Sequence, residues 1–157
     1  MAIQYAAKLG CKVVVLSGSD RKKDEATKLG ASEFVATKGA KELKVSQKID
    51  RLLVTTSAQP DWNLLVPVLA PRATIFPLSV DEGEFKFPYM PFLVNGLRIQ
   101  ASLVASRYIH QRMLAFAALH QIKPIIEKFP MSEQGINDAI EKLQNGGMRY
   151  RGVLTDN

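Results

Sequence analysis

One short polar segment carries the residue types that bind phosphate groups. The segment Ser17–Lys22 (SGSDRK) directly follows the apolar run KVVVL. Hydroxyl groups donate hydrogen bonds to phosphate oxygens, and arginine and lysine add charge-assisted bonds. In dinucleotide-binding domains an acidic residue at this strand end accepts hydrogen bonds from the ribose 2′-OH of NAD, whereas Ser17 takes that place here. The segment therefore predicts a clamp for a 2′-phosphate. The alternative is a polar loop in which Ser19 or Asp20 caps the next helix.

Few residues could bind a metal ion or act as a nucleophile. The sequence has one cysteine, Cys11, and two histidines, His110 and His120. Histidines ten residues apart on one helix do not share a face in the way that an i, i+4 pair does, so no zinc site is expected. No G-x-S-x-G motif is present. We expect Cys11 to be a small buried apolar residue, and a lone cysteine fits a reducing compartment such as the cytosol.

The net charge of +6 raises the question of a nucleic-acid partner. The basic residues are spread along the chain, and the densest run, Arg21-Lys22-Lys23, alternates with acidic residues. A solvated helix face is the simplest explanation, a site for a small phosphate comes next, and no nucleic-acid partner is expected. No stretch approaches the roughly 20 apolar residues that span a membrane. The N-terminus does not resemble a secretory signal, so a cytoplasmic protein without a membrane partner is expected.

The pattern of apolar residues predicts strands that alternate with helices. The expected strands are Lys12–Leu16 (covered on both faces), Glu33–Ala36, Ile49–Thr56, Ala73–Leu78, Leu97–Val104 and Tyr150–Leu154, with an extended segment at Lys123–Phe129. The expected helices are Met1–Leu9, Asp20–Leu29, Asp61–Leu69, one that Ser106 caps and that ends near His120, and one between Ser132 and Gly146-Gly147. A short helix or loop is expected at Lys38–Ser46, and irregular structure at Asp81–Pro91. This alternation predicts an α/β fold with a doubly wound parallel sheet, as one domain over residues 1–157.

The usual beginning of a Rossmann-like domain is not found in this sequence. Such a domain starts with a strand, a G-x-G-x-x-G turn and a helix that binds the pyrophosphate. Here the first expected helix already starts at Met1, so we expect the first strand and the glycine loop to be lacking. That strand is central in the usual order, so its lack should expose apolar surface and unpaired backbone. Two explanations stay open: a fragment or mis-started gene model, or a short product that recruits a partner.

Several motifs resemble the zinc-dependent medium-chain alcohol dehydrogenases, especially the cinnamyl-alcohol-dehydrogenase-like and fungal NADP(H)-dependent branches. The matching residues are Gln4-Tyr5-Ala6 with Gly10, Ser17-Gly18-Ser19-Asp20, Lys22-Lys23, Glu25-Ala26, Leu29-Gly30-Ala31, and the ending Met148-Arg149-Tyr150-Arg151-Gly152-Val153. The resemblance spans essentially the whole chain and implies the nucleotide-binding portion of such an enzyme.

The resemblance also implies a set of cofactor-binding residues. Ser17, Ser19 and Lys22 would contact the 2′-phosphate of NADP(H), with Arg21 as a fourth residue, while Gly18 replaces a serine of plant members. Thr55, Thr56 and Ser57 would lie where the polypeptide chain runs past the adenine ribose in members of this family. Leu78 and Ser79 would lie near the nicotinamide, and Ser102, Leu103 and Val104 would contact its carboxamide through their backbone. The alternative is that small polar residues end strands in any α/β fold.

The resemblance implies reversible hydride transfer between NADP(H) and an alcohol or aldehyde. In the parent family zinc polarises the substrate oxygen, and its ligands belong to a domain that would precede Met1, so this chain alone is expected to be inactive. A homodimer is implied through the strand at Leu97–Leu103, with Phe85–Phe92 against the partner; a monomer with an ordinary edge strand is the alternative. A non-catalytic NADP(H)-binding or dimer-interaction module, and a zinc-free quinone or enone reductase of the same superfamily, are the alternative functions.

Overall fold

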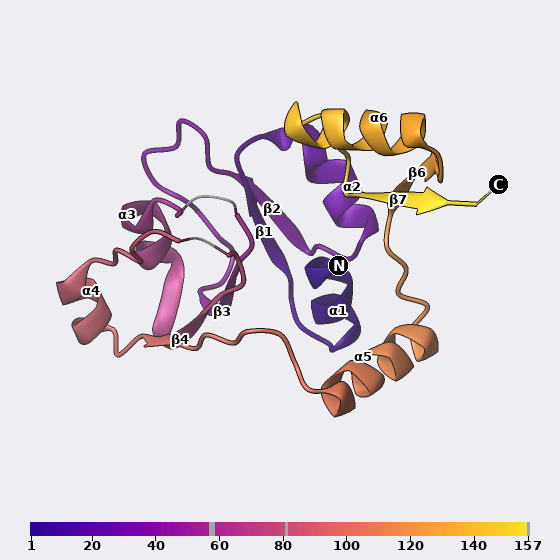
Figure 1. Ribbon diagram of the computed structural model, residues 1–157. Coiled ribbons are helices and arrows are strands. Elements are labelled where there is room, and N and C mark those ends of the chain that lie inside the picture. Colours follow the sequence, from indigo (N-terminus) through magenta and orange to yellow (C-terminus); the bar gives the residue numbers. More distant parts are fainter. Residues whose placement is uncertain (57–58, 81, 157) are drawn as a thin grey trace. The chain divides into compact units, whose positions relative to one another are not determined.

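All strand pairs in the described residues are parallel, as the alternation of strands and helices predicts. The computed structural model describes residues 1–56, 59–80 and 82–156. Its strands are β1 (Val14–Ser17), β2 (Glu33–Ala36), β3 (Ile49–Val54), β4 (Leu69–Pro77), β5 (Arg98–Ile99), β6 (Ile126–Pro130) and β7 (Arg151–Thr155). They form three sheets with the orders β1–β2, β3–β4–β5 and β6–β7 (Figure 1). The prediction of an α/β fold with parallel strands is confirmed.

The helices follow the predicted positions with local differences. They are α1 (Ala2–Lys8), the 3-10 turn Asp20–Lys22 followed by α2 (Lys23–Lys28), α3 (Trp62–Leu65) followed by the 3-10 turn Val66–Val68, α4 (Tyr89–Val94), α5 (Arg107–Leu119) and α6 (Glu133–Gln144). Ser132 caps α6 as predicted, because its hydroxyl accepts a hydrogen bond of 3.1 Å from the N–H of Gly135. The predicted cap by Ser19 or Asp20 is wrong: Ser19 precedes the first 3-10 turn without a capping bond.

The described residues group into two compact units, whereas the sequence pattern predicts one domain. The first unit is Ala2–Phe116, and the second comprises Met1 and Ala117–Asn157. Helix α5 begins in the first unit and ends in the second. The first unit contains the five strands β1 to β5, and the second contains the β6–α6–β7 unit, in which α6 packs on both strands.

The core of the first unit is built around β4. Ile75, in this strand, is completely buried, because β4 has a parallel neighbour on each side. Strands in the interior of a parallel sheet are covered on both faces and therefore need apolar side chains on both. The buried cluster consists of Leu43, Leu52, Val54, Trp62, Leu65, Val68, Leu69, Ala73, Ile75 and Leu97.

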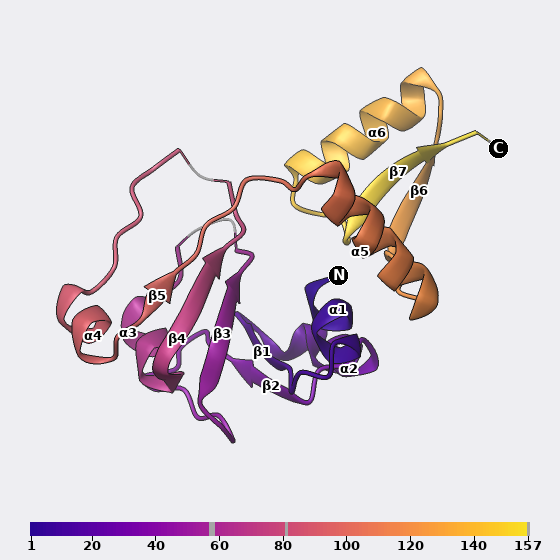
Figure 2. The same ribbon diagram turned by 90° about the horizontal axis from the view of Figure 1, so that it is seen from below.

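The two sheets of the first unit are not hydrogen bonded to each other. Strand β1 pairs with β2 and β3 pairs with β4, and no strand ladder joins β1 to β3 in the part of the chain that is described. Both views show the β1–β2 pair beside β3, on the side away from β4 (Figures 1 and 2). Leu16 of β1 and Val35 of β2 nevertheless pack against the core cluster. The prediction that β1 is covered on both faces is wrong: it is half-buried along its whole length.

A polar contact, which we call the clip, joins the amino ends of these strands. The carboxylate of Glu33, at the start of β2, accepts hydrogen bonds from the backbone N–H of Ser46 at 2.9 Å and from its hydroxyl. The ammonium of Lys12, just before β1, donates to the same hydroxyl at 2.9 Å. Hydrogen bonds from the Ser46 hydroxyl and backbone hold the pKa of Glu33 below its ordinary value, with the Lys12 charge adding to the effect. Since Ser46 precedes β3, the three strands start at the same edge.

Three predictions of the sequence pattern are wrong in this part of the fold. The strand expected at Leu97–Val104 covers two residues, Arg98 and Ile99, because Pro77, which would donate the next hydrogen bond of β4 in this ladder, has no backbone N–H. The segment Asp81–Pro91, expected to be irregular, contains the start of α4, although Asp81 itself lies outside the described residues. Cys11 is exposed rather than buried, since it lies in the turn after α1.

Candidate functional site

Ser17 ends β1 in a conformation that leaves its hydroxyl available. Its backbone carbonyl accepts hydrogen bonds from the N–H of Thr37 at 2.7 Å and from the Thr37 hydroxyl at 3.3 Å. These two bonds fix the backbone of Ser17 against β2 after the last paired residues, Ser17 and Ala36. The side chain of Ser17 is half-buried and has no hydrogen-bond partner among the described residues.

The residues that follow Ser17 add a second hydroxyl and two positive charges. Ser19 is half-buried in an extended conformation, and Arg21 and Lys22 are exposed in the 3-10 turn before α2. None of these three side chains has an internal hydrogen bond or ion pair within residues 1–56, 59–80 and 82–156. A Cβ atom at Gly18 would meet no other atom within 4 Å. The structure therefore brings the predicted clamp residues onto one turn, with their polar groups unengaged.

The ends of β3 and β4 form a second group of predicted site residues. The hydroxyl of Ser79 donates to the backbone carbonyl of Thr56, and lies 3.4 Å from the carbonyl of Val54. The N–H of Leu78 donates to the same Val54 carbonyl at 2.9 Å. These bonds hold Thr56, Leu78 and Ser79 together at the carboxyl end of the sheet, with Thr55 directly after β3. The predicted residue Ser57 lies outside the described residues.

The third group, Ser102–Val104, follows β5 as an exposed segment. The last bond of this strand to β4 runs from the N–H of Gln100 to the carbonyl of Ile75, at 2.9 Å. Leu103 and Val104 are 85% and 82% exposed. Val104 has a φ of 50°, which is rare for a β-branched residue. Such strained conformations concentrate at functional sites.

All three groups follow carboxyl ends of strands. The clip places the amino ends of β1, β2 and β3 at one edge, so the residues after β1 and β3 belong to the opposite edge. In open α/β sheets ligands bind outside this carboxyl edge.

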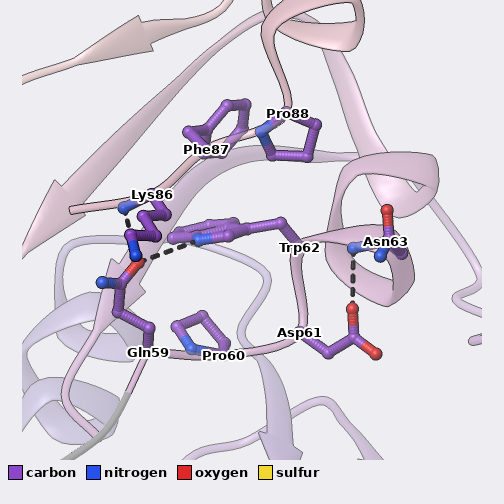
Figure 3. A pocket seen from close by; sticks show the side chains of 8 residues that line it. All are labelled: Gln59, Pro60, Asp61, Trp62, Asn63, Lys86, Phe87 and Pro88. Atoms are coloured by element: carbon purple, nitrogen blue, oxygen red, sulfur yellow. Dashed lines mark hydrogen bonds between the residues drawn. The ribbon is translucent and has the colours of Figure 1, made fainter. Parts of the chain in front are cut away.

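A hollow that the sequence pattern did not predict lies beside α3. It has a volume of about 460 Å³ and is lined by Gln59, Pro60, Asp61, Trp62, Asn63, Lys86, Phe87 and Pro88 (Figure 3). The indole of Trp62 lies between Pro60 and Phe87 in this view, and its ring centre is 4.7 Å from that of Phe87. None of the predicted cofactor-binding residues lines it.

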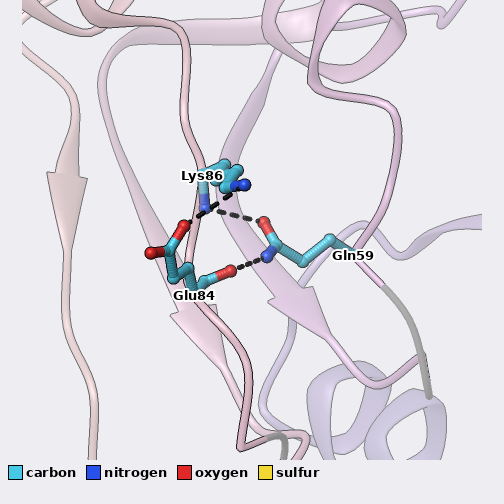
Figure 4. Close-up of polar contacts among 3 residues, drawn as sticks. All are labelled: Gln59, Glu84 and Lys86. Atoms are coloured by element: carbon cyan, nitrogen blue, oxygen red, sulfur yellow. Dashed lines mark hydrogen bonds and ion pairs between the residues drawn. The ribbon is translucent and has the colours of Figure 1, made fainter.

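Gln59 connects the two segments that line this hollow. Its side-chain carbonyl accepts a hydrogen bond of 3.0 Å from the N–H of Lys86, and its amide donates to the carbonyl of Glu84 (Figure 4). Phe85, Phe87 and Trp62 pack as an aromatic cluster on the core. This cluster holds the 84–88 segment in place. In the sequence, the single tryptophan and the alternating phenylalanines Phe85 and Phe87 could have indicated it.

The described residues do not bring together the side chains that a zinc ion needs. Among the described residues, no group of three or more His, Cys, Asp or Glu side chains lies close enough together to hold a metal. No helix in those same residues is long and apolar enough to cross a membrane.

Comparisons with known proteins give a consistent result. The family described as zinc-binding dehydrogenase matches residues 1–119. An aldehyde reductase from Synechocystis is 31% identical over 156 residues, which are 99% of this chain and 46% of that protein. A probable mannitol dehydrogenase from Mesembryanthemum crystallinum is 32% identical over 98% of this chain and 43% of its own length.

Solved structures of this type share the fold. A cinnamyl alcohol dehydrogenase from Sorghum bicolor superposes with a TM-score of 0.82 at 30% identity, over 98% of this chain and 44% of its own. A cinnamyl alcohol dehydrogenase from Helicobacter pylori, solved with NADP(H), superposes with a TM-score of 0.78 at 24% identity, over 98% and 44%. The chain thus has the Rossmann-like nucleotide-binding fold of these enzymes and spans less than half the length of the relatives it matches.

Proposed function

Because the chain belongs to the zinc-binding dehydrogenase family, we propose that it is the nucleotide-binding portion of an NADP(H)-dependent alcohol dehydrogenase or aldehyde reductase. The observation that carries this proposal is the set of unengaged polar groups after β1. Ser17 and Ser19 offer hydroxyl donors, and Arg21 and Lys22 offer positive charge, without competing internal partners. An acidic residue in the place of Ser17 would repel a 2′-phosphate.

The remaining groups suit the rest of the same cofactor. Thr55 and Thr56 follow β3 and would lie beside the adenine ribose. Leu78 and Ser79 follow β4 and would lie near the nicotinamide. The exposed backbone of Ser102–Val104 would bind the carboxamide. When bound, NADP(H) supplies or accepts the hydride. The part of this chain is to bind and orient the nucleotide, because its described residues do not fit a zinc ion.

We also propose that the protein forms a homodimer through the edge at β5. The strand is the last of its sheet, and four exposed apolar residues of α4 lie next to it in sequence: Tyr89, Met90, Leu93 and Val94. Exposed apolar residues gathered on one short helix favour an interface with a partner. The ordered strand is shorter than residues 97–103, so α4 would contribute more of the contact than the strand itself.

The phosphate clamp can be tested without the whole cofactor. Adenosine 2′-monophosphate presents the group that the clamp binds, and adenosine 5′-monophosphate has the same charge in another place. We expect the chain to bind the 2′-isomer at least about tenfold more tightly, since a charge-assisted hydrogen bond is worth roughly 1.5–3 kcal/mol. Isothermal titration calorimetry or ligand-observed NMR measures both affinities.

A matched pair of variants makes the test specific. Ser17→Asp should remove the preference for the 2′-isomer, because it places a carboxylate beside the phosphate. Ser32→Asp adds the same charge to an exposed position at the amino edge of β2 and should leave the preference unchanged. Equal binding of the two isomers by the unaltered chain, or equal effects of the two variants, would refute the clamp.

A further inference from the structure

The backbone holds the end of β2 directly beside Ser17. Ser17 is in register with Ala36, and its carbonyl accepts hydrogen bonds from the N–H of Thr37 at 2.7 Å and from the Thr37 hydroxyl at 3.3 Å. Neighbouring strands of a sheet lie roughly 4.8 Å apart. Because β1 and β2 are parallel, the residues that follow Thr37 emerge at the same carboxyl edge as the segment Ser17–Lys22.

A tight turn fixes the backbone of Lys38 at this edge. The N–H of Ala40 donates to the carbonyl of Thr37 at 3.2 Å, and Gly39 between them has a φ of 77°, a value that glycine adopts readily. The side chain of Lys38 is exposed and makes no hydrogen bond or ion pair with any residue that the structure describes. Its ammonium is therefore free to bind a ligand beside Ser17.

The charge after β1 alone does not balance a phosphate monoester. Arg21 and Lys22 bring two positive charges and Asp20 brings one negative charge, so the segment Ser17–Lys22 has a net charge of +1. A phosphate monoester carries about −1.5 to −2 charges at pH 7. One further cation at this edge brings the two charges close to equality, and Lys38 is the first cation that follows β2 in the chain.

We propose that the ammonium of Lys38 is a third cation of the 2′-phosphate clamp, which approaches the phosphate from β2 while Arg21 and Lys22 approach it from β1. This inference rests on the proposed function. A lysine ammonium is a compact charge with three donors on a flexible stem, so it binds a phosphate without demanding one geometry. The preference for NADP(H) over NAD(H) is then set by two segments that meet at Ser17 and Thr37, 20 residues apart.

Two variants that lose the same charge test the assignment by calorimetric titration. Lys38→Met removes the ammonium and keeps the aliphatic stem, whereas Lys28→Met does the same at the end of α2, which leads to the amino end of β2. Lys38→Met should weaken the binding of adenosine 2′-monophosphate at least about threefold and leave that of the 5′-isomer unchanged. Lys28→Met should change neither, and Lys38→Arg, which keeps the charge, should retain most of the affinity.

Phosphorus NMR gives a measurement that a purely structural role of Lys38 would not change. The second pKa of a phosphate monoester is about 6, and a neighbouring cation lowers it because it favours the doubly charged form. Binding to the unaltered chain should therefore lower this pKa of adenosine 2′-monophosphate. Lys38→Met should raise the pKa of the bound phosphate toward its free value, and Lys28→Met should leave it unchanged.

The outcomes separate this inference from the proposed function. Equal losses for the two isomers in Lys38→Met would show a general attraction of anions and overturn the inference. Unchanged affinity and unchanged phosphate pKa in Lys38→Met would also overturn it, and the proposed function would stand if the unaltered chain still preferred the 2′-isomer. An unaltered chain that prefers neither isomer would refute the proposed function, and the third cation with it.

Discussion

The backbone of Gly30 passes so close to helix α1 that a Cβ atom at position 30 would lie 2.7 Å from the Cβ of Ala7. Gly30 also has a φ of 110°, a conformation that side-chain-bearing residues rarely adopt. The turn between α2 and β2 therefore needs glycine for two independent reasons. Helix α1 is held from another side by Tyr5, whose ring stacks on Phe116 with 5.9 Å between the ring centres.

Gly30→Ala should destabilise the first unit by about 2–4 kcal/mol, because the conformational strain and the overpacking against Ala7 add. Gly39→Ala is the control: its φ is also positive, at 77°, but its Cβ would meet no atom within 4 Å. The control should cost about 1–2 kcal/mol. Urea unfolding followed by the fluorescence of Trp62, the single tryptophan, measures both losses. Equal losses would show that the contact with Ala7 does not matter.

The clip predicts a dependence of stability on pH. Ser46 lowers the pKa of Glu33 in the folded chain, so the carboxylate contributes stability above its ordinary pKa and this contribution is lost as pH falls through the lowered value. Glu33→Gln should therefore reduce the stability at about pH 7 more than at about pH 3. Glu42→Gln, which removes an exposed ion pair with Lys44, should show little change at either pH. Urea midpoints at the two pH values decide between these outcomes, and a pH-independent effect of the Glu33 change would contradict the prediction.

Gly18→Ser should strengthen the binding of adenosine 2′-monophosphate. The position has open space for a side chain, and the new hydroxyl would lie between Ser17 and Ser19. One added hydrogen bond is worth about 0.5–1.5 kcal/mol, so the dissociation constant should fall roughly two- to tenfold. Gly18→Ala fits the same space without the hydroxyl and should not strengthen binding. Calorimetric titrations compare the two variants, and a similar affinity for both would argue against a phosphate beside residue 18.

Gly135, in the second unit, lies as close to a neighbouring segment as Gly30 does in the first. A Cβ atom on this residue of α6 would lie 2.2 Å from the carbonyl oxygen of Pro130, the last residue of β6. Gly135→Ala should therefore destabilise the β6–α6–β7 unit by about 3 kcal/mol or more, because the backbone itself must move. Gly147→Ala is the control, since its nearest neighbour would lie at 3.5 Å. Hydrogen exchange of the peptide that contains Val153 of β7 should accelerate strongly for the first variant and little for the second. If both exchange alike, the close approach at Gly135 is not structurally important.

The elements that were predicted well are those that local sequence determines. The run at β1, the strand Glu33–Ala36 and the helix capped by Ser132 depend on β-branched residues or on a cap three residues away. The position of Ser17 at a strand end followed from the same local pattern. The length of β5 depended instead on its pairing with β4, whose residues lie more than 20 positions earlier in the chain.

The parts of the site that were missed depend on contacts between distant residues. Gln59 bonds to Glu84 and Lys86, which are 25 and 27 residues away. The clip joins Lys12 to Ser46 across 34 residues. No periodicity or spacing in a single sequence marks such pairs, because each residue alone is an ordinary polar surface residue.

Val104 holds the segment after β5 in a strained backbone conformation. Its left-handed backbone costs roughly 1–2 kcal/mol relative to an extended one, and its 82% exposed side chain gains almost no packing in return. A ligand or neighbouring chain that binds this backbone would supply contacts that the exposed side chain lacks, and would therefore stabilise this conformation. A change that let residue 104 relax would make the chain more stable and, for the same reason, a poorer receptor.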